Sequence, residues 1–167
     1  MTMQTETWRV AKRSAWASGA VLVLTSVHHA YGAYRYATPW RLHVVGIAVV
    51  AALGLMGALA WLRARPTGGS GWAATGLFAL VTLAIPVGMI GAYEGLYNHL
   101  LKNILFFGGT SPALLLRLFP PPTYELPNDV LFELTGSLQV LPAVIAAQAL
   151  LQFLRARKDR RVAVRPT

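Results

Sequence analysis

Four stretches of the chain contain no Asp, Glu, Lys or Arg, and each is long enough to cross a lipid bilayer: 14–34, 42–62, 66–93 and 134–154. An α-helix rises about 1.5 Å per residue and the hydrocarbon layer is roughly 30 Å thick, so about 20 apolar residues are enough. None of the four stretches shows the apolar-polar alternation of a barrel strand, and unpaired backbone groups are costly in lipid. The pattern predicts an all-α integral membrane protein, with 1–167 forming a single transmembrane four-helix domain.

Local signals set the expected helix boundaries at 14–35, 39–63, 72–99 and 127–155. Thr38-Pro39 is a typical start for the second helix, and the short turn before it makes the first two helices antiparallel neighbours. Pro86 lies inside the third helix and is expected to kink it. Past 99 the third helix is expected to continue to Phe107 and to stop at the glycines at 108 and 109, with this last part lying in the membrane interface between helices three and four. Pro112 is expected to start another short helix.

The distribution of Lys and Arg predicts the orientation of the four helices. Eleven of the fifteen basic residues fall on one side of this topology, in the N-terminal segment, the second loop, and Arg155 with the tail at 156–167. By the positive-inside rule we expect that side, with both termini, to be cytoplasmic, and the protein to be a multi-pass protein of the cell inner (plasma) membrane. The 55% hydrophobic and 13% charged composition agrees with a lipid environment, and the formal charge of +9 is then first a topology signal.

Composition and motifs also bound the chemistry and the partners. The chain has no Cys, which excludes disulfides and thiolate metal sites, and no phosphate-binding, dinucleotide-binding or zincin motif is found in it. A short basic tail beside a membrane favours anionic lipid headgroups, so we expect no nucleic-acid binding. Assembly as a homo-oligomer or with a membrane partner subunit stays open.

The polar residues gather at one level of the predicted bundle. All four histidines fall in the outer half or at the outer surface, as do four of the six acids, among them Glu94, Asp129 and Glu133. His28 and His29 lie about 10 Å below the outer end of the first helix, where an ionisable group is costly unless it finds a partner. Because neighbouring residues in a helix differ by about 100°, we expect only one of the two to face the bundle centre.

All four helices place an imidazole or a carboxylate at one depth. This pattern favours a metal site at the outer, periplasmic face. Such ligands suit iron, zinc, copper or manganese, and the site could support redox chemistry, as in an oxidoreductase. The expected metal ligands are His28, His29, His43, Glu94, His99 and Glu133, and the expected cofactor-binding neighbours are Tyr31, Arg35, Tyr97 and Asn98. One objection is spacing, since Glu94 and His99 are five residues apart and would point in different directions from an α-helix.

Three other interpretations of the same residues stay open, one of which is a pathway for a small molecule or a proton. A b-type haem could be held by two histidines, with His28 or His29 facing His43 or His99. Alternatively, the polar residues only tie helices together in a structural or accessory subunit, with Glu94 paired to His28 and Arg35 to Glu133. In that interpretation Asp129 caps the fourth helix and Glu125 is a solvated loop residue. The sequence leaves open whether the protein is an enzyme.

Overall fold

The computed structural model describes residues 3–121 and 125–163, and side chains within 5–121 and 125–159; the last four residues of the predicted basic tail, with Arg165, and the side chains of Arg160 and Arg161 lie outside this description. The described residues are helical, with no strand among them. The elements are α1 (Met3–Arg35), η1 (Pro39–Leu42), α2 (His43–Ala64), α3 (Gly68–Thr82), η2 (Leu83–Leu101), α4 (Lys102–Phe107), α5 (Pro112–Leu118), α6 (Val130–Leu138) and α7 (Val140–Ala163).

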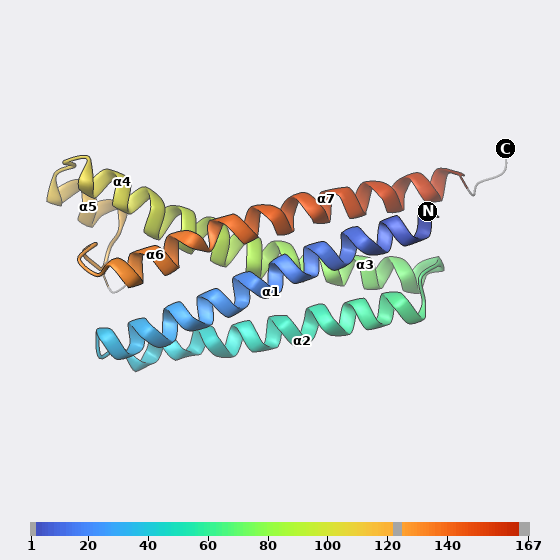
Figure 1. Ribbon diagram of the computed structural model, residues 1–167, viewed down its shortest axis with the longest axis horizontal. Coiled ribbons are helices and arrows are strands. Elements are labelled where there is room, and N and C mark those ends of the chain that lie inside the picture. The colour runs from blue at the N-terminus through green and yellow to red at the C-terminus, as the bar shows by residue number, and fades with distance from the viewer. Residues whose placement is uncertain (1–2, 122–124, 164–167) are drawn as a thin grey trace.

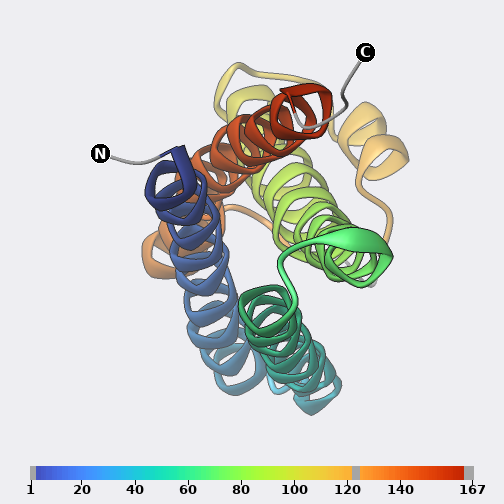
Figure 2. The same ribbon diagram turned by 90° about the vertical axis from the view of Figure 1, so that its right-hand side faces the viewer.

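Four long rods run side by side along the length of the molecule: α1, α2, α3 with η2 and α4, and α6 with α7 (Figure 1). Viewed from the end, α1 lies between α2 and α7, and the α3–η2 rod lies across from it, touching both α2 and α7 (Figure 2). The start of α1 and the end of α7 lie at the same end of the molecule, and α5 lies at the opposite end (Figure 1). Consecutive rods are therefore antiparallel.

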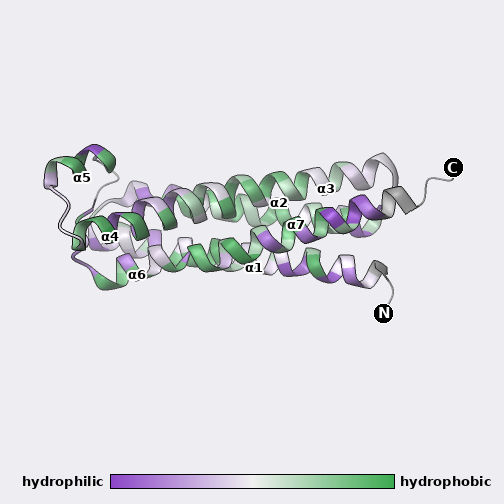
Figure 3. Cartoon of the chain, turned by 90° about the horizontal axis from the view of Figure 1, so that it is seen from above, coloured by the Kyte–Doolittle hydropathy of each residue, from purple (hydrophilic) through white to green (hydrophobic). Residues whose placement is uncertain are grey.

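Three of these rods are long and apolar enough to cross a membrane: Pro39–Ala64, Gly68–Phe107 and Val130–Asp159. Hydrophobic residues dominate the middle of the rods, while hydrophilic residues gather toward the ends (Figure 3). Large apolar side chains on the outside, such as Val50, Leu80 and Leu141, are well exposed. Because water does not favour such a surface, the rods are suited to contact with lipid. The fourth rod, α1, is as long but is not among these spans, since its apolar run is interrupted by His28, His29 and several hydroxyl residues.

Two segments of the long rods depart from regular α-helix. The first is η2, a π-helical run that begins three residues before Pro86. A proline inside an α-helix lacks one hydrogen-bond donor and clashes with the preceding turn, and wider i→i+5 hydrogen bonding is one way to accommodate it. The second is the break at Gln139 between α6 and α7, where Pro142 cannot donate to the carbonyl of Leu138.

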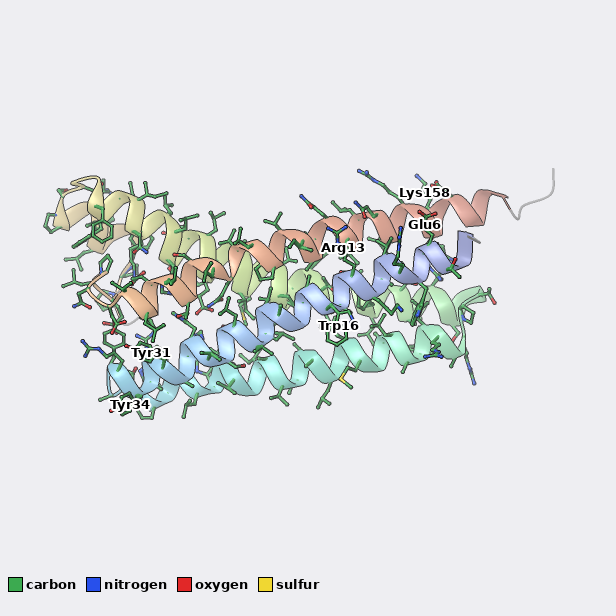
Figure 4. The ribbon with its side chains drawn as sticks, viewed as in Figure 1. Glu6, Arg13, Trp16, Tyr31, Tyr34 and Lys158 are labelled. Atoms are coloured by element: carbon green, nitrogen blue, oxygen red, sulfur yellow. The ribbon has the colours of Figure 1, made fainter. Side chains whose placement is uncertain are left out.

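Charged residues mark the two ends of the rods. Arg13 and Lys158 lie toward the end that holds the termini, whereas Tyr31 and Tyr34 lie at the other end (Figure 4). Arg157 of the tail is held within the fold: its guanidinium donates to the carbonyl of Pro66 at 3.1 Å and packs over the Trp72 ring. The basic end therefore includes one cation that contributes to packing as well as to surface charge.

Ion pairs tie the loops together at the opposite end. Arg41 donates to Glu125 at 2.6 Å, and Arg35 donates to Asp129 at 2.8 Å. Two expectations were wrong here: Glu125 is paired rather than solvated, and Arg35 pairs with Asp129 rather than Glu133. The capping role predicted for Asp129 is confirmed, because its carboxylate accepts the Phe132 amide at 3.0 Å at the start of α6.

Candidate metal centre

Two adjacent histidines of α1 converge on one carboxylate of η2. The Nε2 atoms of His28 and His29 lie 3.4 Å and 3.3 Å from the same oxygen, Oε1 of Glu94. We expected one histidine to face the bundle centre and the other to meet an adjacent helix; both meet η2, and His28 is the more deeply buried of the two. Thr25, one turn earlier on α1, donates weakly at 3.4 Å to the other Glu94 oxygen.

A third imidazole comes from the far end of η2. His99 is 4% exposed, and its ring meets the His28 ring edge-on with 4.6 Å between centroids. One ligand atom from each of His28, Glu94 and His99 lies within 4.8 Å of the other two, so this buried group could hold a metal ion. His29 is not part of this closest group, although it touches Glu94.

The π-helical run explains why Glu94 and His99 meet. In an α-helix, residues five apart point in different directions, which was the objection to pairing them as ligands. In a π-helix the backbone bonds from residue i to residue i+5, so residues five apart lie on nearly the same side. Glu94 and His99 both lie in η2, and the spacing objection was therefore wrong for this segment.

His99 is held from behind by a charged pair. Its Nδ1 lies 2.8 Å from Oε2 of Glu133, and the other Glu133 oxygen accepts from Lys102 Nζ at 2.8 Å. Lys102 also donates to the carbonyl of Glu125 at 2.9 Å. A carboxylate behind a ligating imidazole fixes its ring orientation and tautomer, which is a common outer shell of metal sites. Glu133, predicted as a ligand, thus lies where it would orient one.

The hydrogen bonds of the three imidazoles assign the same tautomer to each. His29 Nδ1 lies 3.0 Å from the carbonyl oxygen of Thr25, which can only accept. His99 Nδ1 faces an ionised carboxylate. His28 Nδ1 lies 3.0 Å from the Thr135 hydroxyl, which gives its own proton to backbone carbonyls of α6, at 2.7 Å to Leu131. Each Nδ1 therefore carries the hydrogen and each Nε2 keeps a lone pair.

The imidazole nitrogens without hydrogens therefore present lone pairs to the lone pairs of the Glu94 carboxylate. Two Nε2 atoms without hydrogens approach one carboxylate oxygen in a buried setting, an arrangement that is unfavourable without a proton or a cation between them. A protonated Glu94 would donate to one imidazole, but hydrogen bonds from O–H groups are normally about 2.5–3.0 Å long. Donors that share a metal ion at about 2.1 Å are themselves about 3.0–3.4 Å apart, which is closer to the separations seen here.

Small residues make room for the rings. A Cβ on Gly136 of α6 would lie 2.4 Å from the His99 ring, so only glycine fits beneath it. A Cβ on Gly32 would lie 2.6 Å from Phe132, whose ring stacks on His28 with 4.2 Å between centroids. Gly91 and Gly95 of η2 likewise allow a close approach of α7, since added Cβ atoms there would meet Ala143 and Val140.

A cavity of about 270 Å³ lies beside the outer shell of this group, between α4 and the start of α6. Its mostly apolar wall includes Asn103, Phe107, Val130 and Glu133. The His99–Glu133 pair is therefore the part of the group nearest to a hollow in the surface.

Five of the predicted residues are not brought into this group. His43 is exposed, with Nδ1 2.5 Å from the Trp40 carbonyl and its ring stacked on Trp40. Tyr31 donates to Asp129 at 2.8 Å, as does Arg35, so both belong to the outer ion pairs. Tyr97 donates to the carbonyl of Leu118 at 2.5 Å, and Asn98 is half-buried beside His99.

Three residues around the group were not predicted from sequence: Thr25, Lys102 and Thr135. Thr25 could have been found, because it lies one turn from His28 and His29 on the same face of α1. Lys102 follows the predicted third span, yet its side chain is 3% exposed and neutralises Glu133. Gln139 is fully buried, and neither its amide oxygen nor its nitrogen has a hydrogen-bond partner among the described residues.

Comparisons with protein-family models, curated proteins and solved structures found no match to this chain.

Proposed function

We propose that this protein binds a first-row transition-metal ion between its helices, with His28, Glu94 and His99 as ligands and His29 as a fourth donor. The observation that carries the proposal is the convergence of unprotonated imidazole nitrogens on the Glu94 carboxylate. The Nε2 atoms of His28 and His29, left unprotonated by their Nδ1 hydrogen bonds, lie 3.4 Å and 3.3 Å from one Glu94 oxygen, and His99 offers a ligand atom within 4.8 Å of those of His28 and Glu94. A cation at the centre turns that repulsion into coordination.

The donor chemistry limits the metals. Imidazole nitrogen and carboxylate oxygen without sulfur suit iron, zinc, copper and manganese, of which all but zinc can also support a redox step. The outer shell fits a resident metal: Glu133 would orient His99, and Thr135 would orient His28. A ligand set fixed in this way before the ion arrives favours binding.

A b-type haem is the less favoured cofactor. Two axial histidines must stand on opposite faces of a porphyrin, whereas the His28 and His99 rings meet edge-on at 4.6 Å. Phe132 stacks on His28 and lies 5.2 Å from His99, which fills the adjoining space. Haem binding would require these rings to separate.

The membrane arrangement that we propose is a four-helix transmembrane bundle with α1 as the fourth span. Support comes from the length of α1 and from its position between α2 and α7 (Figure 2). The polar residues of α1 lower its hydropathy, and for this reason it is not among the three candidate spans. These residues face inward, as His28 and Thr25 show by their burial. The basic end that holds both termini would be cytoplasmic, at the inner membrane, with its free cations near anionic lipid headgroups, and the metal group would lie toward the outer face.

The test is the metal content of the protein purified in detergent from metal-replete cells. Elemental analysis should find about one transition-metal ion per chain in the wild type. His99→Ala removes a proposed ligand and should lose the metal. His43→Ala is the matched control, because it removes an exposed imidazole outside the group and should keep the metal.

Folding must be measured in parallel, by helical content and by elution from a sizing column. If the wild type is folded and still free of metal after incubation with each of the four ions, the proposal is wrong. Equal metal content in the His43 and His99 variants would also contradict it. A Soret band in the purified protein would instead identify the haem alternative.

A further inference from the structure

The Gln139 side chain is a buried polar group beside the metal centre whose role the ligand set leaves unexplained. It is fully buried, and both of its amide atoms lack hydrogen-bond partners among the described residues. A buried amide without partners costs free energy, so a group of this kind usually serves a ligand or a water molecule. Leucine or methionine would fill the same volume without that cost.

The local backbone brings Gln139 to the metal centre. It stands at the break between α6 and α7, one turn after Thr135. A Cβ on Gly95, the residue after Glu94, would lie 3.3 Å from the Gln139 Cβ. The absence of a side chain at Gly95 thus lets this part of the chain pack directly against η2, beside Glu94. Any contact between the amide and the Glu94 carboxylate is too long or too bent to be a hydrogen bond.

The net charge of the metal-loaded site limits which ligand the Gln139 amide could bind. Glu133 is neutralised by Lys102, whereas Glu94 contacts two imidazoles and a hydroxyl and forms no ion pair with a Lys or Arg among the described residues. A divalent ion bound there would leave one net positive charge in a buried site, and low-dielectric surroundings disfavour that. An additional ligand with one negative charge would neutralise the centre.

We infer that the metal centre takes a small, singly charged anion as an exchangeable ligand, and that the Gln139 amide donates a hydrogen bond to it. This inference rests on the proposed metal site and names the class of molecule that the site binds. Hydroxide, azide and similar small anions fit the class. A bulky organic substrate does not, because the group is packed among His28, His99 and Phe132.

The test uses azide as the probe and cobalt(II) as the reporter ion. Protein loaded with cobalt(II) in detergent is titrated with sodium azide, and the visible absorption bands of the metal are followed. Azide should change the wild-type spectrum with saturation. Gln139→Leu should bind cobalt(II) as the wild type does but should bind azide about tenfold or more weakly, because a hydrogen bond to a charged ligand is lost.

Thr82→Val is the matched control. Thr82 is also fully buried with an unpartnered hydroxyl among the described residues, and it lies twelve residues before Glu94 in the same rod. Both substitutions remove a buried polar group that lacks a partner among the described residues, but only the change at 139 should weaken azide binding. If Gln139→Leu does not fold, Gln139→Met provides the same test.

The outcomes separate this inference from the proposed function. If wild-type protein binds cobalt(II) but its spectrum ignores azide, this inference is wrong and the metal site stands. Equal azide affinity in the wild type and the variant at 139 would overturn the role of the amide. Failure of the folded wild type to bind any of the metal ions would overturn both.

Discussion

Gly136→Ala tests whether the position of the His99 ring matters for metal binding. The new methyl group would lie 2.4 Å from two ring carbons and 2.6 Å from Nδ1, whereas ordinary contact begins near 3.4 Å. The ring must therefore shift by about 1 Å. Coordination distances tolerate about 0.2 Å, so such a shift breaks either the bond to the metal or the bond to Glu133.

The expected loss follows from that displacement. Disturbing an orienting partner of a ligating histidine typically lowers metal affinity by 10–100-fold, which corresponds to about 1.4 to 2.8 kcal/mol. Overpacking should also lower the stability of the metal-free protein, by about 1–3 kcal/mol. The assay is a cobalt(II) titration against a competing chelator, with thermal unfolding of the metal-free protein measured beside it.

Gly46→Ala is the control for this substitution. It also adds a methyl group to a helical glycine, but nothing lies within 4 Å of the new atom. We expect unchanged cobalt(II) affinity and equal or slightly higher stability, because alanine favours helix. Wild-type affinity in a folded Gly136→Ala protein would refute the assignment of His99 as a ligand.

Further predictions concern the outer shell, the α6 cap and the topology. Glu133→Gln removes the charge that holds His99 and leaves Lys102 unneutralised, so cobalt(II) affinity should fall by about 10–100-fold in the chelator titration; an unchanged value would mean that this pair does not act on the metal. Asp129→Ala removes the α6 cap and should cost about 1 kcal/mol in thermal unfolding without changing metal affinity; a large affinity loss would place Asp129 in the site instead. In the naturally cysteine-free chain, Ser111→Cys should react with an impermeant maleimide in intact cells and Thr67→Cys only after lysis, and the reverse result would invert the topology.

The sequence was a good guide to the helices because their signals are local. Charge-free stretches, the Asp129 cap, the glycines after Phe107 and the proline that opens α5 each act within a few residues, and the last three mark helix ends in the structure. The number of spans is a different matter, because buried polar residues lower the hydropathy of α1 below that of the other three rods. Whether a polar helix is buried depends on its neighbours, which the pattern of one helix does not contain.

The candidate site was predicted in part. The predicted depth in the membrane alone placed His28, Glu94 and His99 at one level. The same reasoning included His43, which the turn at Trp40 directs to the surface. The pairing of Glu94 with His99 depends on the π-helical geometry of η2, and α-helical spacing predicts the opposite. The partners of Glu133 and the burial of Gln139 come from packing between distant segments, for which one sequence offers no spacing rule.

X-ray absorption spectroscopy of the metal-loaded protein tests the central claim most directly, because it reports which atoms surround the ion. The account predicts nitrogen and oxygen neighbours at about 2.0–2.2 Å, with the outer scattering of two or more imidazole rings and no sulfur shell. Imidazole scattering should diminish in His28→Ala and stay unchanged in His43→Ala. An ion surrounded by oxygen alone, with no imidazole contribution, would contradict the account.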